Sequence, residues 1–227
     1  MEKQQAVEEA IKFVQDEVRY LGLELAENSH RPHKPNEVFT NRYGDCKDKS
    51  LLLSTILNQL GVESSPALVA TSFKHKVKDY LATPKVFNHA IVKLNWLGKE
   101  IWIDPTINYQ GNSLETVAQP DYGMTLLVKD GIAKLDDATP VHAKTPKVVL
   151  KDTFWSVDYV SPVEWTVESL YTGSEAERFR RRLASNGEKQ ESRSFLNYYA
   201  KYFPKIRRVK PVEFIDDRQA NEFRIVE

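Results

Sequence analysis

The chain has 227 residues, of which 41% are hydrophobic and 11% aromatic, as is ordinary for a globular protein with a buried core. Its 32 lysines and arginines balance its 32 aspartates and glutamates, so the composition does not favour binding to nucleic acid or to an anionic membrane surface. A single cysteine excludes an intramolecular disulfide, and no apolar run is long enough to span a bilayer. We therefore expect a soluble chain without direct membrane insertion.

The first predicted element is an amphipathic helix over residues 3–20, where apolar side chains recur at helical spacing between charged ones. An extended, proline-containing loop is expected over residues 28–35, followed by a short turn or helical piece over residues 35–41. Residues 47–60 predict a buried helix, because leucine and isoleucine cover a broad face and Gly61 stands where a C-terminal cap belongs.

The sequence after the buried helix is rich in β-formers. A strand is predicted over residues 65–71, and a hairpin over residues 87–97 and 100–104 with its turn at Leu97-Gly98-Lys99. Residues 124–129 predict one more strand. Between the first strand and the hairpin lies a polar, lysine-rich excursion over residues 73–85, which is long enough to act as a lid over a nearby site.

A change of composition around residues 139–147 predicts a boundary between a part spanning residues 1–140 and a part spanning residues 145–227. The second part is expected to begin with antiparallel strands over residues 148–159 and 163–171. We expect additional domains of a parent protein beyond this chain.

Two helices are predicted in the second part, over residues 174–183 and 192–202. Ser174 with Glu177 three residues later suggests a capping box at the first of them. That helix also carries four closely spaced arginines, which we interpret as a solvated face.

Cys46 is the only cysteine, and it stands between a Gly-Asp turn and the buried helix, where the helix should begin. Free N–H groups and the positive end of the helix dipole favour a thiolate over a thiol at such a position, and the thiolate is the nucleophilic form. The alternative is a small residue that fills the core. The flanking charged side chains of Asp45, Lys47, Asp48 and Lys49 are expected to face solvent or to pair locally.

A thiol nucleophile needs a base, and a third group that orients the base. His89 opens a strand whose rigid backbone can aim the ring at a neighbouring helix terminus, and Asp104 ends the next strand. A paired hairpin would bring the two close together, with a bulge or a slanted register absorbing the difference in strand length. An Asp-Pro pair at a strand end is also a common turn former. The other histidines lie in loops or in the linker, where surface positions explain them: His30, His33, His75 and His142.

Three segments in this order resemble three sequence blocks of the transglutaminase-like superfamily of papain-type folds: residues 43–50, 87–92 and 102–106. The resemblance covers residues 5–135. The sequence Gly-Asp-Cys-Lys-Asp-Lys, together with residues 31–39, is most similar to bacterial members in which this core follows an N-terminal β-sandwich of unknown function.

The resemblance implies an α+β fold. We expect a papain/transglutaminase-like core, in which N-terminal helices precede a catalytic helix packed on an antiparallel sheet, followed by a β-rich C-terminal portion with two helices. No cofactor is implied. A metal site is not expected either, because one cysteine and scattered histidines lack the paired spacing of a zinc site.

The resemblance also implies roles for the three chemical residues. Cys46 would be the nucleophile, His89 the general base and acid, and Asp104 the residue that orients His89. Attack on a peptide or protein amide would give a thioester and release an amine, after which water or a second amine completes the turnover. The backbone N–H of Cys46 is the first oxyanion-hole candidate, and further candidates for the oxyanion or substrate site are Tyr20, Asp45 and Asn88.

Hydrolysis by a cysteine peptidase or amidase is the first choice. Animal transglutaminases have an aromatic residue after the cysteine and a tryptophan upstream, whereas here Lys47 follows Cys46 and no tryptophan precedes it. Amine transfer to protein glutamine is therefore the second hypothesis, and a catalytically silent scaffold or peptide-binding module is the third. The sequence leaves the compartment open, with an exported or envelope-associated bacterial protein as one option.

Overall fold

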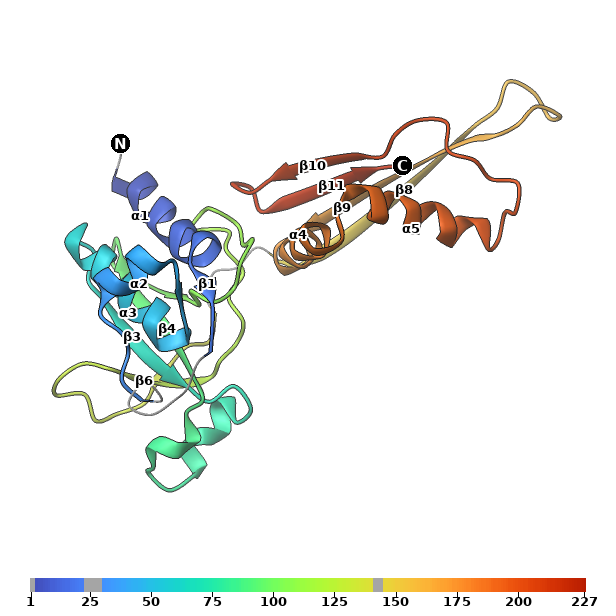
Figure 1. The fold of residues 1–227 in the computed structure, drawn as a ribbon. Coiled ribbons are helices and arrows are strands. Elements are labelled where there is room, and N and C mark those ends of the chain that lie inside the picture. Colours follow the sequence, from blue (N-terminus) through green and yellow to red (C-terminus); the bar gives the residue numbers. More distant parts are fainter. Residues whose placement is uncertain (1–2, 23–29, 141–144) are drawn as a thin grey trace. The chain divides into compact units, whose positions relative to one another are not determined.

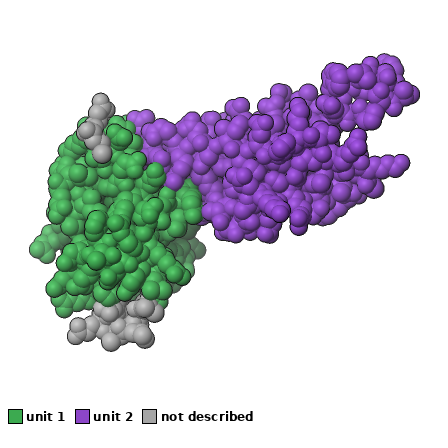
Figure 2. Space-filling view, turned by 45° about the horizontal axis from the view of Figure 1, so that its top comes forward, with its two compact units in different colours: residues 1–109, 119–143 green, residues 110–118, 144–227 purple. Residues whose placement is uncertain are grey.

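The computed structural model describes residues 3–22, 30–140 and 145–227, and it shows the α+β fold that the sequence predicts (Figure 1). The chain folds into two compact units (Figure 2). The first unit holds residues 1–109 and 119–143, and the second holds residues 110–118 and 144–227. Part of the predicted boundary, residues 141–144, lies outside the described residues.

The first unit contains the N-terminal helices and a mainly antiparallel β-structure. Its elements are α1 (Lys3–Lys12), the π-helix η1 (Phe13–Glu17), β1 (Arg19–Tyr20), α2 (Pro35–Asn41), β2 (Tyr43–Gly44), α3 (Cys46–Gln59), β3 (Ser64–Val69), the 3-10 helices η3 (Lys74–Asp79) and η4 (Pro84–Val86), β4 (His89–Trp96), β5 (Lys99–Ile103), β6 (Met124–Leu127) and β7 (Asp136–Asp137).

The N-terminal helix is predicted over residues 3–20, but the helical segment ends at Glu17. Its backbone changes from an α-helix to a π-helix at Phe13. After α1 and η1 the backbone of Val18 is already extended, and the Arg19 N–H donates to the Arg42 carbonyl at 2.8 Å. This bond belongs to a two-residue parallel pairing of β1 with β2. Pairing with β2 therefore ends the helix before its apolar pattern ends.

The five-stranded antiparallel sheet has the order β5-β4-β3-β6-β7, and α3 packs on β3 and β4. Buried Leu52, Leu53 and Leu57 on α3 supply the apolar face that the leucine pattern predicts. The β4–β5 hairpin turns at Leu97 and Gly98, whose φ angles of 52° and 78° are the positive values that a type I′ turn requires.

The hairpin register explains how His89 and Asp104 come together. Val92 pairs with Ile103, so continuing the ladder by one residue places Asp104 opposite Ile91. Ile91 and His89 are two residues apart and lie on the same face of β4. Asp104 is therefore the diagonal cross-strand neighbour of His89, a distance that these side chains can bridge.

The second unit is a four-stranded antiparallel sheet in the order β10-β11-β9-β8 with two helices, so both predicted helices are present. Its elements are β8 (Lys147–Trp155), β9 (Glu164–Thr172), α4 (Ser174–Asn186), α5 (Glu188–Ala200), β10 (Glu213–Asp217) and β11 (Glu222–Val226). Its core contains buried Ala176, Phe179, Phe223 and Ile225. No helix within the described ranges is long and apolar enough to cross a membrane.

The predicted capping box at α4 is wrong. Gly173 is the N-cap, and the Glu177 side chain is buried, where its carboxylate accepts hydrogen bonds from the backbone N–H groups of Gly111 (3.1 Å) and Ala118 (3.0 Å). The side-chain amide of Asn221 donates to the same carboxylate at 2.9 Å. Glu177 therefore ties residues 110–118 into the second unit instead of capping its own helix.

The solvated arginine face predicted on α4 also needs correction. Arg180 is only 4% exposed, and its guanidinium donates to Asp216 at 2.7 Å and to the side chain of Asn221 at 2.7 Å. Arg180 thus holds the turn between β10 and β11 against the helix, while Arg178 keeps a largely exposed side chain.

The buried Glu177 carboxylate yields a stability prediction. In Glu177→Gln the new side-chain NH₂ group faces N–H groups that now donate to the carboxylate, so at least one of these hydrogen bonds is lost. We therefore expect the free energy of unfolding to fall by roughly 2–3 kcal/mol. The matched control is Glu175→Gln in the same helix, where the partly exposed carboxylate pairs with Arg178. Urea unfolding followed by tryptophan fluorescence measures both variants, and equal midpoints for the two would contradict the assigned role.

Candidate active site

The start of α3 is fixed by a capping box around Cys46. The Asp45 carboxylate accepts hydrogen bonds from the backbone N–H groups of Lys47 (3.0 Å) and Asp48 (3.2 Å). In return, the Asp48 carboxylate accepts the Asp45 N–H at 3.1 Å. The Cys46 N–H belongs to the first turn of α3, at the positive end of the helix, where backbone donors have no partner within the helix.

Two neighbouring segments hold this helix start in place. A Cβ on Gly44 would lie 2.7 Å from the Asp48 Cβ, so only glycine permits this close approach. His33 donates its backbone N–H to Asp48 at 2.8 Å, and its ring nitrogen Nδ1 lies 3.1 Å from the same carboxylate. His33, interpreted from sequence as a surface residue, is thus a half-exposed partner of the capping box.

The structure brings Cys46, His89 and Asp104 together. The His89 Nε2 lies 2.8 Å from the Asp104 Oδ2, with side chains that are 15% and 1% exposed. Interaction with the Cys46 thiol also raises the pKa of the His89 ring, and Cys46 is half-buried rather than part of the closed core. Because Nε2 faces Asp104, the Nδ1 atom is the one left for the thiol. The ring therefore lies between a carboxylate and a potential nucleophile.

Asp104 is held by more partners than the sequence indicates. Its Oδ1 accepts hydrogen bonds from the Thr106 N–H (2.8 Å) and hydroxyl (2.7 Å), and its Oδ2 accepts one from the Tyr122 hydroxyl. Its backbone N–H donates to the Gln119 side chain at 3.1 Å, and its carbonyl accepts from the Gln15 side chain at 2.9 Å. Both the carboxylate and the backbone of Asp104 are fixed.

These supporting residues were not found by sequence reasoning. The Thr106 contact is an Asx-type turn, and the Asp-Pro-Thr order that predicted a turn contains that signal. Tyr122, Gln119 and Gln15 come from a loop and from the N-terminal helix, and no local pattern in the sequence connects them with Asp104.

His89 and Asp104 each favour the charged form of the other. Burial lowers the pKa of His89, but hydrogen bonds and charge interactions with Asp104 and Cys46 outweigh burial and raise that pKa to about 9. Burial raises the pKa of Asp104, but His89, Tyr122 and Thr106 together hold it below its usual value. At neutral pH the ring is therefore an imidazolium beside a carboxylate.

The three further candidates occupy different positions. Tyr20 is 47% exposed and pairs through β1 with Gly44, two residues before Cys46. Asp45 is the helix N-cap described above. The Asn88 side chain is tied to Thr71, since its Oδ1 accepts the Thr71 N–H at 2.9 Å and its Nδ2 donates to the Thr71 hydroxyl at 2.9 Å. Any substrate role of these residues stays a prediction.

The charged side chains around Cys46 are more deeply buried than expected. Asp45 and Asp48 pair locally, as predicted, but they are only 3% and 2% exposed. Lys47 forms an ion pair with Asp45. Lys49 is completely buried, contrary to the prediction that it faces solvent or pairs locally.

Two further histidines have other positions. His75 contacts Asp121 at 3.3 Å, and His142 belongs to the undescribed range. Within the described ranges, no group of three or more histidine, cysteine, aspartate or glutamate side chains is arranged to hold a metal ion.

The lysine-rich excursion forms one wall of a groove of about 550 Å³. The groove is lined mainly by apolar side chains, among them Val77, Leu81, Phe87, Leu126 and Ile132. Gly123 anchors the excursion, because a Cβ there would lie 2.4 Å from the His75 backbone nitrogen. A lid function for the excursion stays a prediction.

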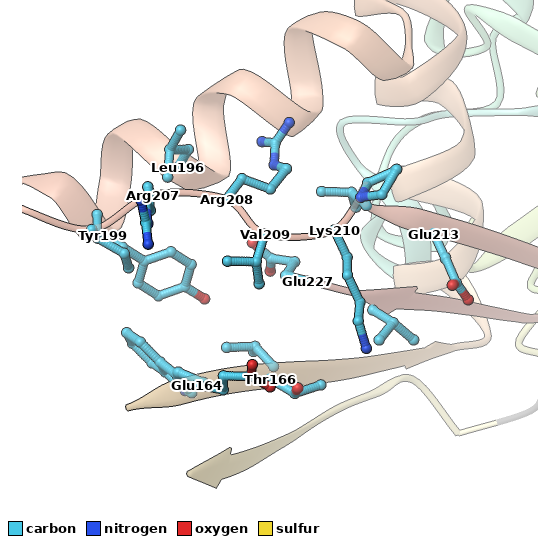
Figure 3. Close-up of a pocket in the computed structure, with 16 residues that line it drawn as sticks. Glu164, Thr166, Leu196, Tyr199, Arg207, Arg208, Val209, Lys210, Glu213 and Glu227 are labelled. Carbon is cyan, nitrogen blue, oxygen red and sulfur yellow. The ribbon is translucent and has the colours of Figure 1, made fainter. Parts of the chain in front are cut away.

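A cavity of about 210 Å³ lies in the second unit (Figure 3), between α5, β9, β11 and residues 206–212. Burial raises the pKa of Glu227 in this cavity to about 7, although the charge of Arg208 and a hydrogen bond with Tyr199 oppose the shift. The described lining residues include neither cysteine nor histidine. The cavity therefore lacks the nucleophile and base that the first unit possesses.

The raised pKa of His89 makes stability depend on pH. Because the folded-state value of about 9 exceeds the ordinary histidine value of 6.5, the stabilisation is complete below about pH 6.5 and is lost as the pH rises through 9. We expect the free energy of unfolding to fall by roughly 2–3 kcal/mol more in the wild type than in His89→Gln between about pH 6 and pH 10. Urea titrations across this range measure the difference, and parallel curves would contradict the ion pair.

A second prediction concerns the hydroxyl of Tyr122. Tyr122→Phe keeps the ring but removes a donor that lowers the Asp104 pKa, so stability should be lost at a higher pH during acidification. We expect a loss of roughly 1–2 kcal/mol at neutral pH. Acid unfolding followed by circular dichroism tests this, with Tyr80→Phe as the control because Tyr80 is 51% exposed. Coincident curves for the two variants would show that the hydroxyl does not support Asp104.

Comparison with known proteins finds a family model that matches part of the first unit. A family model described as the transglutaminase-like superfamily matches residues 1–103, a range that contains Cys46 and His89 and ends one residue before Asp104. No curated protein matches the chain. One similar crystal structure, described as that of a "putative protease" from Parabacteroides distasonis, is 14% identical over 61% of this chain with a TM-score of 0.45, and this chain covers 25% of its length. Residues 1–103 of this chain are thus similar to the transglutaminase-like superfamily.

Proposed function

We propose that the chain is a cysteine hydrolase, a peptidase or amidase, that cleaves an amide bond in a peptide or protein. One observation carries the proposal: the His89 ring makes a hydrogen bond with the buried Asp104 carboxylate and interacts electrostatically with the half-buried Cys46 thiol. This order of groups is the nucleophile, base and orienting acid of acyl-transfer chemistry. The similarity of residues 1–103 to the transglutaminase-like superfamily supports the same interpretation.

In the first half-reaction, the Cys46 thiolate attacks the amide carbonyl carbon, and the carbonyl oxygen becomes an oxyanion. The Cys46 N–H at the start of α3 is placed to stabilise this charge, and the exposed Tyr20 hydroxyl is the candidate for a second donor. The imidazolium of His89 then gives its proton to the leaving nitrogen as the C–N bond breaks. The products are a Cys46 thioester and a free amine.

In the second half-reaction, the neutral His89 ring takes a proton from water, whose oxygen attacks the thioester. The C–S bond breaks, a carboxylic acid leaves, and the thiolate–imidazolium pair is restored. Asp104 remains ionised throughout and keeps the ring oriented with Nε2 toward the carboxylate. Hydrolysis requires no binding site for a second amine, and Lys47 occupies the place of the aromatic residue of animal transglutaminases.

Site-selective labelling tests the nucleophile. We expect iodoacetamide to alkylate Cys46 rapidly at about pH 6, where an isolated thiol reacts slowly, and we expect His89→Gln to reduce the rate at least about tenfold. His75→Gln is the matched control, because this histidine pairs with Asp121 instead of Asp104. Intact-mass spectrometry gives the rates, and Cys46→Ala should take up no label. Equal rates in the wild type and His89→Gln would refute the proposed chemistry.

The reaction itself is tested with a peptide library in the presence and absence of methylamine. Hydrolysis predicts carboxylic acid products that require Cys46, whereas methylamide products would establish amine transfer instead. Peptides that bind without being converted in either condition would favour the silent scaffold and contradict the hydrolase.

A further inference from the structure

Lys49 is a buried cation inside the helix that begins with Cys46. Its side chain is 0% exposed, although it lies in a segment that the sequence marks as polar. Lys49 follows Cys46 by three positions, so the two side chains are neighbours on the surface of α3. Burying an ammonium group is costly unless the surroundings compensate for it, so the surroundings of Lys49 need an explanation.

The hydrogen bonds of Lys49 lead to the backbone of Asp104. Its Nζ donates to the carbonyl oxygens of Val18 (2.6 Å) and Gln15 (3.3 Å), where the N-terminal helix ends. The Gln15 side chain in turn donates to the Asp104 carbonyl at 2.9 Å. One chain of contacts therefore runs from the helix that carries the thiol, through the end of η1, to the acid of the site.

Lys49 also interacts electrostatically with Asp104. Burial lowers the pKa of Lys49 to about 8, while the negative charges of Asp104 and Asp16 raise it. Lys49 is thus mostly protonated at neutral pH. Asp16 also accepts the Tyr109 N–H at 2.8 Å, which keeps its carboxylate in the same region. Two carboxylates from different segments act on this single ammonium group.

A purely structural cap would not need this charge, because a neutral amide can donate to a carbonyl without the cost of burying an ion. The positive charge of Lys49 instead offsets negative charges in the site. A thiolate at Cys46 adds a second negative charge beside His89, which already faces the Asp104 carboxylate, and the imidazolium of His89 supplies only one positive charge in return. Lys49 supplies a second one from inside the protein.

We propose that Lys49 is a positioning residue of the site, whose buried ammonium group favours the ionised forms of Asp104 and Cys46 while its hydrogen bonds hold η1 and, through Gln15, the backbone of Asp104. The inference rests on the proposed thiol chemistry and deepens it. Lys49 does not touch the substrate; it acts through Asp104 and through the electrostatic field at the start of α3.

The test separates the charge of Lys49 from its hydrogen bonds. Lys49→Gln keeps an N–H donor but loses the charge, and Lys49→Arg keeps the charge. The matched control is Lys47→Gln, which removes a cation beside Cys46 that is already neutralised by Asp45. The readout is the rate of alkylation of Cys46 by iodoacetamide from about pH 5 to pH 9, which needs no knowledge of the substrate.

We expect Lys49→Gln to move the acid limb of the alkylation profile to higher pH, so that the rate at about pH 6 falls roughly 3- to 10-fold while the rates converge near pH 9. Lys49→Arg should follow the wild type, and Lys47→Gln should show a smaller shift. A merely structural role would slow alkylation equally at every pH or leave it unchanged.

An unshifted profile in Lys49→Gln, or an equal shift in Lys47→Gln, overturns the inference. If Lys49→Gln does not fold by circular dichroism and gel filtration, the reciprocal measurement decides: the side-chain ¹³C resonance of Lys49 should titrate at a lower pH in Asp104→Asn than in the wild type, and an unchanged midpoint overturns the inference. A wild-type profile that is insensitive to His89→Gln refutes the proposed function, and with it this inference. A sensitive wild type with an unshifted Lys49→Gln refutes the inference alone.

Discussion

The contact on which the candidate site depends is the 2.8 Å bond between the His89 ring and the buried Asp104 carboxylate. A carboxylate that is 1% exposed cannot be compensated by water, so its charge requires donors from the protein. His89, Tyr122 and Thr106 supply them. The same bond fixes the ring with one nitrogen toward the acid, which leaves the other for the thiol. Orientation, charge and proton transfer in the site thus depend on one interaction.

The rest of the first unit holds the two ends of this interaction. The type I′ turn at Leu97 and Gly98 sets the hairpin register that makes Asp104 the diagonal neighbour of His89. The capping box of Asp45 fixes where α3 begins, and therefore where Cys46 lies. Neither device touches a substrate. Both are local backbone features. One fixes the position of Cys46, and the other brings Asp104 next to His89.

The sequence was most informative where the chemistry is local. The position of Cys46 at a helix start could be predicted from the Gly-Asp turn and the leucine pattern, and the approach of Asp104 to His89 followed from the hairpin turn. Contacts between distant segments could not be predicted. Glu177 looked like a capping residue because capping is a local pattern, but its carboxylate is used by residues 110–118. Lys49 looked solvated because its neighbours are charged, and only the fold shows that η1 covers it.

The central claim is that His89 is an imidazolium held between Asp104 and Cys46. Nitrogen-15 NMR of histidine-labelled protein measures this state directly, because it distinguishes a doubly protonated ring from a neutral one. The account predicts that the His89 ring stays doubly protonated up to about pH 9, and that its titration midpoint falls in both Asp104→Asn and Cys46→Ala. A midpoint near the ordinary histidine value of 6.5 in the wild type, unchanged by either substitution, would contradict the account.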